Sequence, residues 1–342
     1  MSVMRCLAAA VVVSAVAAYA QAPVVGDINL YGLRKVAAEK ILKTARLEPG
    51  SPIPPSRGEM EDNLGEIPGV VMARVEAVCC DGPSAIVFVG VEEKGGPHAA
   101  FRTPPAGDAV LPGELIDSYH QFLLAVQRAA MRGSAVEDLS AGHSMMADPD
   151  ARAHQEQFVT YARENLDLVR RVAREAADAE QRAAAVAVLG YSSRKQQVVE
   201  DLQYTMQDPD EAVRANAIRA LTAFAVLSAK QPALGIKISP TWFIEMLNSI
   251  VLSDRTESAK ALLTLTDRGA PEALQQIRER ALPALAEMAR WKTLRYALPP
   301  FLLLGRVAGL TDAQTQENWR KGDREAVIEK ALKPPARRRA AE

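Results

Sequence analysis

The chain has 342 residues, and its 41 basic side chains nearly balance 42 acidic ones, for a formal net charge of −1. A length of about two typical domains, with 48% hydrophobic and 24% charged residues, predicts a globular protein. These values exclude a fully disordered chain, a coiled-coil rod and a polytopic membrane protein. They give no electrostatic case for nucleic-acid binding, which usually requires a strongly basic domain or stripe.

Residues 1–20 have the layout of a secretory signal peptide. Arg5 precedes an apolar stretch over residues 6–18, and Ala18-Tyr19-Ala20 is a small-x-small cleavage site before Gln21. The stretch is shorter than the ~20 residues of a membrane-spanning helix, so we expect cleavage between Ala20 and Gln21. This predicts a periplasmic or secreted protein with no integral membrane segment after cleavage. The alternative is a protein anchored in the membrane by an uncleaved signal.

Signal cleavage would leave two of the three cysteines, the adjacent pair Cys79 and Cys80. In an oxidising compartment the pair could form a vicinal disulfide or link two chains. Successive side chains of a strand point to opposite faces, however, and a bridge between neighbours would be strained. We therefore expect two small packing residues.

Residues 21–95 predict a small mixed domain with the order strand, helix, helix, strand, strand. The strands are indicated by alternation of polar and apolar residues, and the breaks by glycine and proline. A hairpin signal at residues 80–83 joins the last two strands. The elements in chain order are a strand over 27–31, helices over 36–47 and 57–64, and strands over 71–78 and 85–91.

Four short motifs of this domain occur in a recognisable order. They are Ile28-x-Leu30-x-Gly32, Leu47-x-x-Gly50-Ser51-Pro52-Ile53, Leu64-x-x-Ile67-Pro68-Gly69-Val70 and Val87-x-Val89-x-Val91-Glu92-Glu93-Lys94. The ordered set resembles a polypeptide-transport-associated (POTRA) domain. The resemblance implies a β-α-α-β-β fold in the bacterial envelope that binds extended polypeptide at its sheet edge. No series of alternating barrel strands follows, so transporter function is not carried over.

Residues 96–112 are rich in glycine and proline and predict a linker. After it, alanine and leucine are dense and the pattern is helical, with amphipathic helices over 115–131 and 158–177. A loop insertion is expected over 230–240. Residues 333–342 carry the run Arg337-Arg338-Arg339 and predict a disordered basic tail.

The helical part contains an internal repeat. The segments 180–189 and 212–221 align, and a similar small-large apolar face returns at 259–265 and 300–304. The terminal leucines at 189, 221, 265 and 304 are 32, 44 and 39 residues apart. Such periods are typical of solenoids built from helix pairs.

Residues 208–221 resemble the second-helix motif of HEAT repeats. Asp208 and Asp210 lie in the turn that caps the new helix, and alanines let neighbouring helices approach closely. The resemblance implies an all-α superhelical solenoid over 113–332, clearest over 155–310, as in bacterial exported HEAT-repeat proteins. Arg214, and Arg182 at the aligned position, are expected to play a structural role, with Arg214 bridging to aspartates of neighbouring repeats.

No catalytic, cofactor-binding or metal-ligating set is expected. The four histidines lack metal-ligand spacing, and no glycine-rich phosphate loop occurs. His143, close to Asp138 and Ser140, leaves a hydrolase open as an alternative. A pigment lyase of the HEAT-repeat type and a purely structural envelope spacer are further alternatives.

Aromatic and arginine side chains in the later helices are candidate anchors for a partner, because such residues dominate interface energetics. The candidates are Trp242, Phe243, Trp291 and Arg295. Burial of the aromatics in the helical core is the alternative. We therefore expect an exported, non-catalytic scaffold that binds a protein or peptide of the cell envelope. Binding would use the sheet edge, the solenoid groove or both, with peripheral envelope association as a further possibility.

Overall fold

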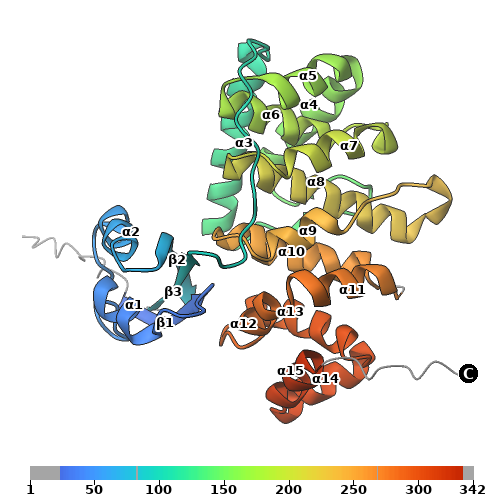
Figure 1. Ribbon diagram of the computed structural model, residues 1–342. Helices are drawn as coiled ribbons and strands as arrows, with labels where there is room; N and C mark the ends of the chain where they lie inside the picture. Colours follow the sequence, from blue (N-terminus) through green and yellow to red (C-terminus); the bar gives the residue numbers. More distant parts are fainter. Residues whose placement is uncertain (1–23, 82–83, 268, 334–342) are drawn as a thin grey trace, which may run out of the picture.

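The computed structural model describes residues 24–81, 84–267 and 269–333. A small α+β unit is followed by a stack of helices (Figure 1). The predicted signal peptide with its cleavage site at Ala20 and Gln21 lies outside the described residues. So do the tail beyond residue 333 and the side chains of Cys79 and Cys80.

The N-terminal unit, residues 24–95, has the predicted order of strands and helices. Its elements are β1 (Val24–Tyr31), α1 (Ala38–Ala45), α2 (Arg57–Gly65), β2 (Val70–Asp81) and β3 (Ser84–Glu93). The sheet order is β1-β3-β2, with β1 parallel and β2 antiparallel to the central strand β3. On β3, Val87 and Val89 face the core under α1 and α2, whereas Ile86 and Phe88 pack into the core of the helical part.

The predicted all-α region is a solenoid, residues 113–333. Its helices α6, α8, α10 and α13 pack side by side in one layer, while α5 packs on α7 and α9 on α11 in the other. The elements are α3 (Gly113–Met131), β4 (Glu137–Asp138), β5 (Met145–Met146), α4 (Pro149–Glu164), α5 (Leu166–Glu175), α6 (Ala179–Leu189), α7 (Lys195–Thr205), α8 (Glu211–Lys230), η1 (Pro232–Leu234), α9 (Thr241–Met246), α10 (Leu252–Leu265), α11 (Pro271–Arg280), α12 (Leu282–Ala289), α13 (Leu294–Val307), α14 (Asp312–Lys321) and α15 (Arg324–Leu332).

The helix expected over residues 158–177 is two helices in the structure. Asn165 ends α4 with φ −127° and ψ 30°, outside the helical region, and its carbonyl accepts a hydrogen bond from the Val169 amide that starts α5. Asparagine competes for local backbone hydrogen bonds and is a weak helix former, which accounts for the break. The short hairpin of β4 and β5 was not expected from the sequence.

Buried ion pairs connect successive repeats in the middle of the solenoid. The Arg182 guanidinium donates two hydrogen bonds of 2.9 Å to Asp208, and Arg214 pairs with Asp254 at 2.9–3.0 Å. These four side chains are at most 2% exposed. Each arginine also donates to two backbone carbonyls of the turn before its own helix. Asp210 caps α8 by accepting from two backbone amides. We call this row of pairs the arginine–aspartate ladder.

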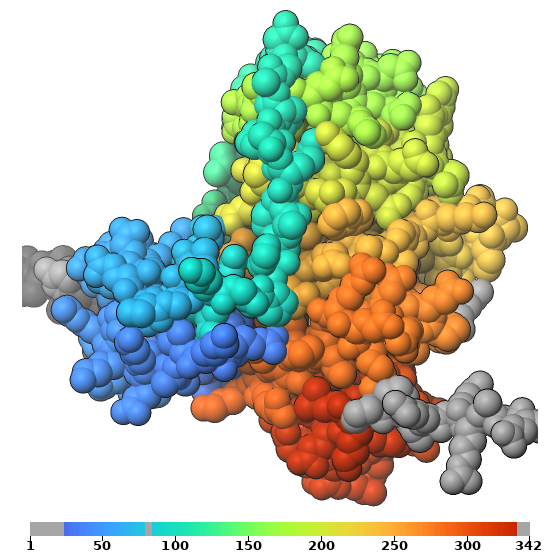
Figure 2. Space-filling model, viewed as in Figure 1, coloured from blue at the N-terminus to red at the C-terminus, as the bar shows by residue number. Residues whose placement is uncertain are grey.

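The predicted linker, residues 96–112, is an extended segment bound along the ladder, which we call the strap (Figures 1 and 2). Arg102 donates to Asp208 at 2.7 Å, and Phe101 lies 4.0 Å under the Arg214 guanidinium. Gly107 exchanges backbone hydrogen bonds of 2.8 Å with Glu175 and Ala177. A Cβ on Gly107 would lie 2.5 Å from the Glu175 carbonyl oxygen, so only glycine permits this approach.

The N-terminal unit is fixed to the solenoid through the open face of its sheet. The Tyr31 hydroxyl donates to the Ile250 carbonyl at 2.7 Å, and Phe88 packs edge-on against Trp291 and Tyr296 with ring centroids 5.0 and 5.1 Å apart. Gly90 makes room for this contact, because a Cβ there would lie 2.6 Å from the Tyr31 ring. The face therefore belongs to the protein core.

Helix α8 is the one described helix with the length and apolar composition of a membrane span. Within the structure, 56% of that window is buried, and α8 packs between α6 and α10. These features are typical of the core helix of a repeat array.

We expect Arg214→Ala to lower the free energy of unfolding by about 3–5 kcal/mol, because it leaves the Asp254 carboxylate buried without its cation. The exposed Arg295 provides a matched control, and Arg295→Ala should change stability by about 0.5 kcal/mol or less. Urea unfolding of the two variants measures the difference. Equal effects would contradict a structural role for the ladder.

Candidate functional site

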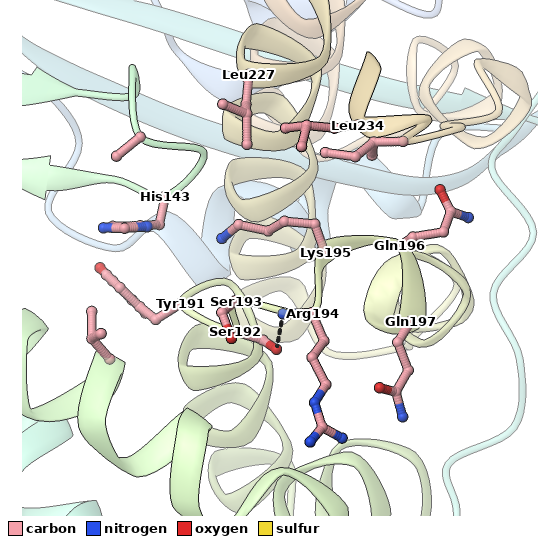
Figure 3. Close-up of a pocket in the computed structure, with 13 residues that line it drawn as sticks. His143, Tyr191, Ser192, Ser193, Arg194, Lys195, Gln196, Gln197, Leu227 and Leu234 are labelled. Atoms are coloured by element: carbon pink, nitrogen blue, oxygen red, sulfur yellow. Dashed lines mark hydrogen bonds between the residues drawn. The ribbon is translucent and has the colours of Figure 1, made fainter. Parts of the chain in front are cut away.

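A cavity of about 590 Å³ opens where the loops between repeats meet (Figure 3). Its wall is formed by the loop between α6 and α7, the first turn of α7, the last turns of α8, η1 and the segment after it, one residue of α4 and the loop between β4 and β5. The apolar lining residues are Ala141, Val159, Leu227, Leu234 and Ile236. The polar ones are His143, Tyr191, Ser192, Ser193, Arg194, Lys195, Gln196 and Gln197.

The cavity and the strap lie at opposite ends of the same two helices. Helix α7 begins at Lys195 in the cavity and ends before Asp208, to which the strap is bound. Helix α8 begins beside Asp208 and reaches the cavity at Leu227. The edge formed by the inter-repeat loops is therefore distinct from the edge that carries the strap and the N-terminal unit.

Lys195 is a buried cation at the centre of this site. Only 9% of the residue is exposed. Its Nζ atom donates to the Gly190 carbonyl at 3.1 Å and lies 4.4 Å from the centre of the Phe224 ring. Both partners are uncharged, and burial lowers the pKa of the Lys195 ammonium to about 7. The site therefore holds an amine near the midpoint of its titration at neutral pH.

His143 and Tyr191 form the wall opposite Lys195. Their rings are tilted against each other with centroids 5.6 Å apart. Burial, followed by the nearby Lys195 charge, lowers the pKa of His143 below its usual value, while Asp138 acts weakly in the opposite direction. Tyr191 accepts a hydrogen bond from Gln155, and burial raises the pKa of its hydroxyl to about 12. At neutral pH both rings are uncharged and each retains an N–H or O–H donor.

The residues of the hydrolase alternative do not form a catalytic chain in the structure. The Ser140 hydroxyl donates to Asp138 at 3.0 Å, and the Ser140 amide donates to the same carboxylate at 2.8 Å. These bonds form a local turn, while the His143 ring packs against Tyr191. Among the residues that the structure describes, no group of three His, Cys, Asp or Glu side chains is placed to hold a metal ion.

The predicted partner anchors lie away from this cavity, and two of them are buried. Phe243 is completely buried, and Trp291 packs between Tyr31 and Phe88 at the junction with the N-terminal unit. Neither side chain can therefore contact a partner at the surface. Trp242 is half-buried against the core, and Arg295 is exposed with its guanidinium over the Tyr296 ring. Of the four predicted anchors, only Arg295 and the exposed part of the Trp242 side chain are therefore accessible to a partner.

Sequence reasoning missed Lys195. The run Ser192-Ser193-Arg194-Lys195 resembles an ordinary solvated loop, and no local pattern marks one of its basic residues as buried. The burial results from the approach of Leu227 on α8 and of the loop that carries His143. Both segments come from other parts of the chain.

We expect Lys195→Met to raise the free energy of unfolding below pH 7, on the order of 4 kcal/mol, because one pKa unit corresponds to about 1.4 kcal/mol. Between about pH 7 and the ordinary lysine pKa of about 10.4, the unfolded chain binds the proton that the folded chain has lost. The free energy of unfolding of the wild type therefore rises relative to that of the variant as pH increases through this window, so the difference between the two becomes smaller. Urea unfolding from pH 6 to 10 measures it, with the exposed Lys237→Met as control. A difference independent of pH would contradict a buried ammonium.

Comparison with protein families gives one match. The family model described as HEAT repeats matches residues 166–235, which extend from the start of α5 to just beyond η1. This stretch contains the ladder residues Arg182, Asp208 and Arg214 as well as much of the cavity wall. No curated protein matches the chain. Residues 166–235 are therefore a HEAT-repeat region, the class of helical array that generally mediates protein binding.

Proposed function

We propose that the protein is an exported, non-catalytic scaffold that binds a polypeptide partner of the bacterial envelope along the edge formed by its inter-repeat loops. The observation that carries the proposal is the open cavity at Lys195, most of whose lining residues belong to the HEAT-repeat region, on the edge opposite the strap. A concave site with apolar walls and a few convergent polar groups is the usual form of a binding site.

Each edge strand of the N-terminal sheet is hydrogen-bonded at one position to another part of the same chain, which favours the solenoid over the sheet edges as the binding surface. On β2, the Val75 amide donates to the Glu61 carboxylate at 2.8 Å. On β1, Val25 exchanges backbone hydrogen bonds of 2.8 and 2.7 Å with Ser51 and Gly50. A peptide strand added to either edge would have to displace these bonds. The POTRA-like sequence motifs support an envelope location rather than a second binding site.

Export rests on the sequence of residues 1–20. We expect the protein expressed in a bacterium with its native N-terminus to be recovered from the periplasmic or extracellular fraction starting at Gln21. Mass spectrometry of the intact protein measures the new terminus. A chain that retains Met1 and stays with the membrane fraction would indicate an uncleaved anchor instead.

We expect a photo-crosslinking amino acid at position 234, on the rim of the cavity, to form adducts with a second polypeptide in cells. Leu294 provides a matched control, because these leucines are 50% and 54% exposed and only Leu234 lines the cavity. Immunoblots and mass spectrometry of the adducts identify the partner. Adducts of equal yield at both positions, or none at position 234, would contradict the proposed binding edge.

A further inference from the structure

We propose that the cavity at Lys195 recognises the C-terminal carboxylate of a polypeptide, with the last side chain of that polypeptide against the apolar wall. This inference rests on the proposed function, since it states which part of the partner the scaffold binds. It follows from the charge of the lining, the position of Lys195 and the distribution of apolar and polar groups around it.

The described lining residues include basic side chains and no acidic one. Arg194, Lys195 and His143 all line the cavity, whereas no aspartate or glutamate is among its described lining residues. The nearby Asp138 already accepts two hydrogen bonds from Ser140. A buried ammonium whose partners are a carbonyl and an aromatic ring gains strongly from an anion, because charge-assisted hydrogen bonds are the strongest type.

The donors of the site converge on one region. Figure 3 shows the Lys195 side chain extending across the cavity toward His143, with Tyr191 beside it, while the Arg194 side chain points away. Within the described residues, the His143 ring has no hydrogen-bond partner, so its N–H is available for a ligand oxygen. Helix α7 begins at Lys195 without a side-chain cap, and the positive end of its dipole adds to the attraction for an anion.

The remaining lining fits the end of a peptide better than a plain acyl chain. Val159, Leu227 and Ile236 offer contact for an aliphatic side chain. The Ser193 hydroxyl and the Gln197 amide line the same cavity, and within the described part of the chain neither has a hydrogen-bond partner. They can pair with backbone amides of a peptide, whereas a fatty acid carries no such groups. The volume of about 590 Å³ lies in the usual range of ligand sites.

Carboxylate binding would be coupled to protonation of Lys195. An anion beside the ammonium raises its pKa, so the complex takes up a proton near neutral pH. Affinity therefore falls as pH rises through about 7, where the free protein loses this charge. His143 loses its positive charge at lower pH, and Tyr191 stays neutral throughout. Arg194 also lines the cavity, but its side chain points away from Lys195 (Figure 3).

The test is affinity selection by the full chain from two peptide libraries at pH 6.5. Both consist of N-acetylated tetrapeptides with the last two residues randomised, one with free carboxylates and the other with amidated ends. We expect selection of free-carboxylate peptides ending in Leu, Ile or Val. The best of them, titrated by calorimetry, should bind about 10- to 100-fold more tightly than the amidated form.

Variants connect this preference to the cavity. Lys195→Met should lose the carboxylate preference, as should Leu234→Glu, which places a negative charge at an exposed rim position. Lys237→Met, in the nearby loop, should retain it, and thermal unfolding checks that all three fold. Equal selection of the two libraries, or a carboxylate preference that survives Lys195→Met, would overturn the inference. So would octanoate that binds as tightly as the best peptide.

The two proposals can fail separately. Adducts at position 234 together with no carboxylate preference would leave the scaffold function standing and refute C-terminal recognition. If peptides bind in a carboxylate-dependent way but no adducts form in cells, the cavity would still bind carboxylates. The proposed polypeptide partner at this edge would then be contradicted.

Discussion

The arginine–aspartate ladder is the constraint on which the rest of the architecture depends. Burying a charged side chain costs free energy unless it is paired and hydrogen-bonded, and Arg182 and Arg214 are each bonded to a carboxylate and to two turn carbonyls. Because these bonds have a fixed geometry, they set the spacing and orientation of successive turns. The strap and the N-terminal sheet are bound along this same row of turns.

The ladder also explains why the chain is one continuous body rather than two domains on a flexible linker. Arg255 extends the row, with its guanidinium 4.5 Å from the Tyr31 ring centre and 3.6 Å from Glu287. Glu287 in turn accepts a hydrogen bond from the Gly32 amide at the end of β1. The sheet therefore docks where the solenoid already presents ordered charges, while the opposite ends of α7 and α8 remain open at the cavity.

The periodic parts of the fold could be predicted from the sequence, because alternation and helical spacing are local properties. The order of strands and helices along the N-terminal unit and the repeat around Asp208 and Arg214 are of this kind. The strap could not be predicted, since proline and glycine read as a linker until the approach of Gly107 to Glu175 is known. The burial of Lys195 could not be predicted for the same reason, because the segments that bury it come from distant parts of the chain.

Gly107 and Arg102 have a mechanical consequence. A repeat array normally bends by small rotations between successive helix pairs, which lengthen one edge and shorten the other. Here the strap is hydrogen-bonded to Glu175 at the end of α5, to Gln181 in the first turn of α6 and to Gln207 just after α7. Because the strap is already extended, it limits how far these three positions can move apart. The curvature of the solenoid can then change mainly by opening or closing the edge opposite the strap, which is formed by the inter-repeat loops. The mouth of the cavity lies on that edge.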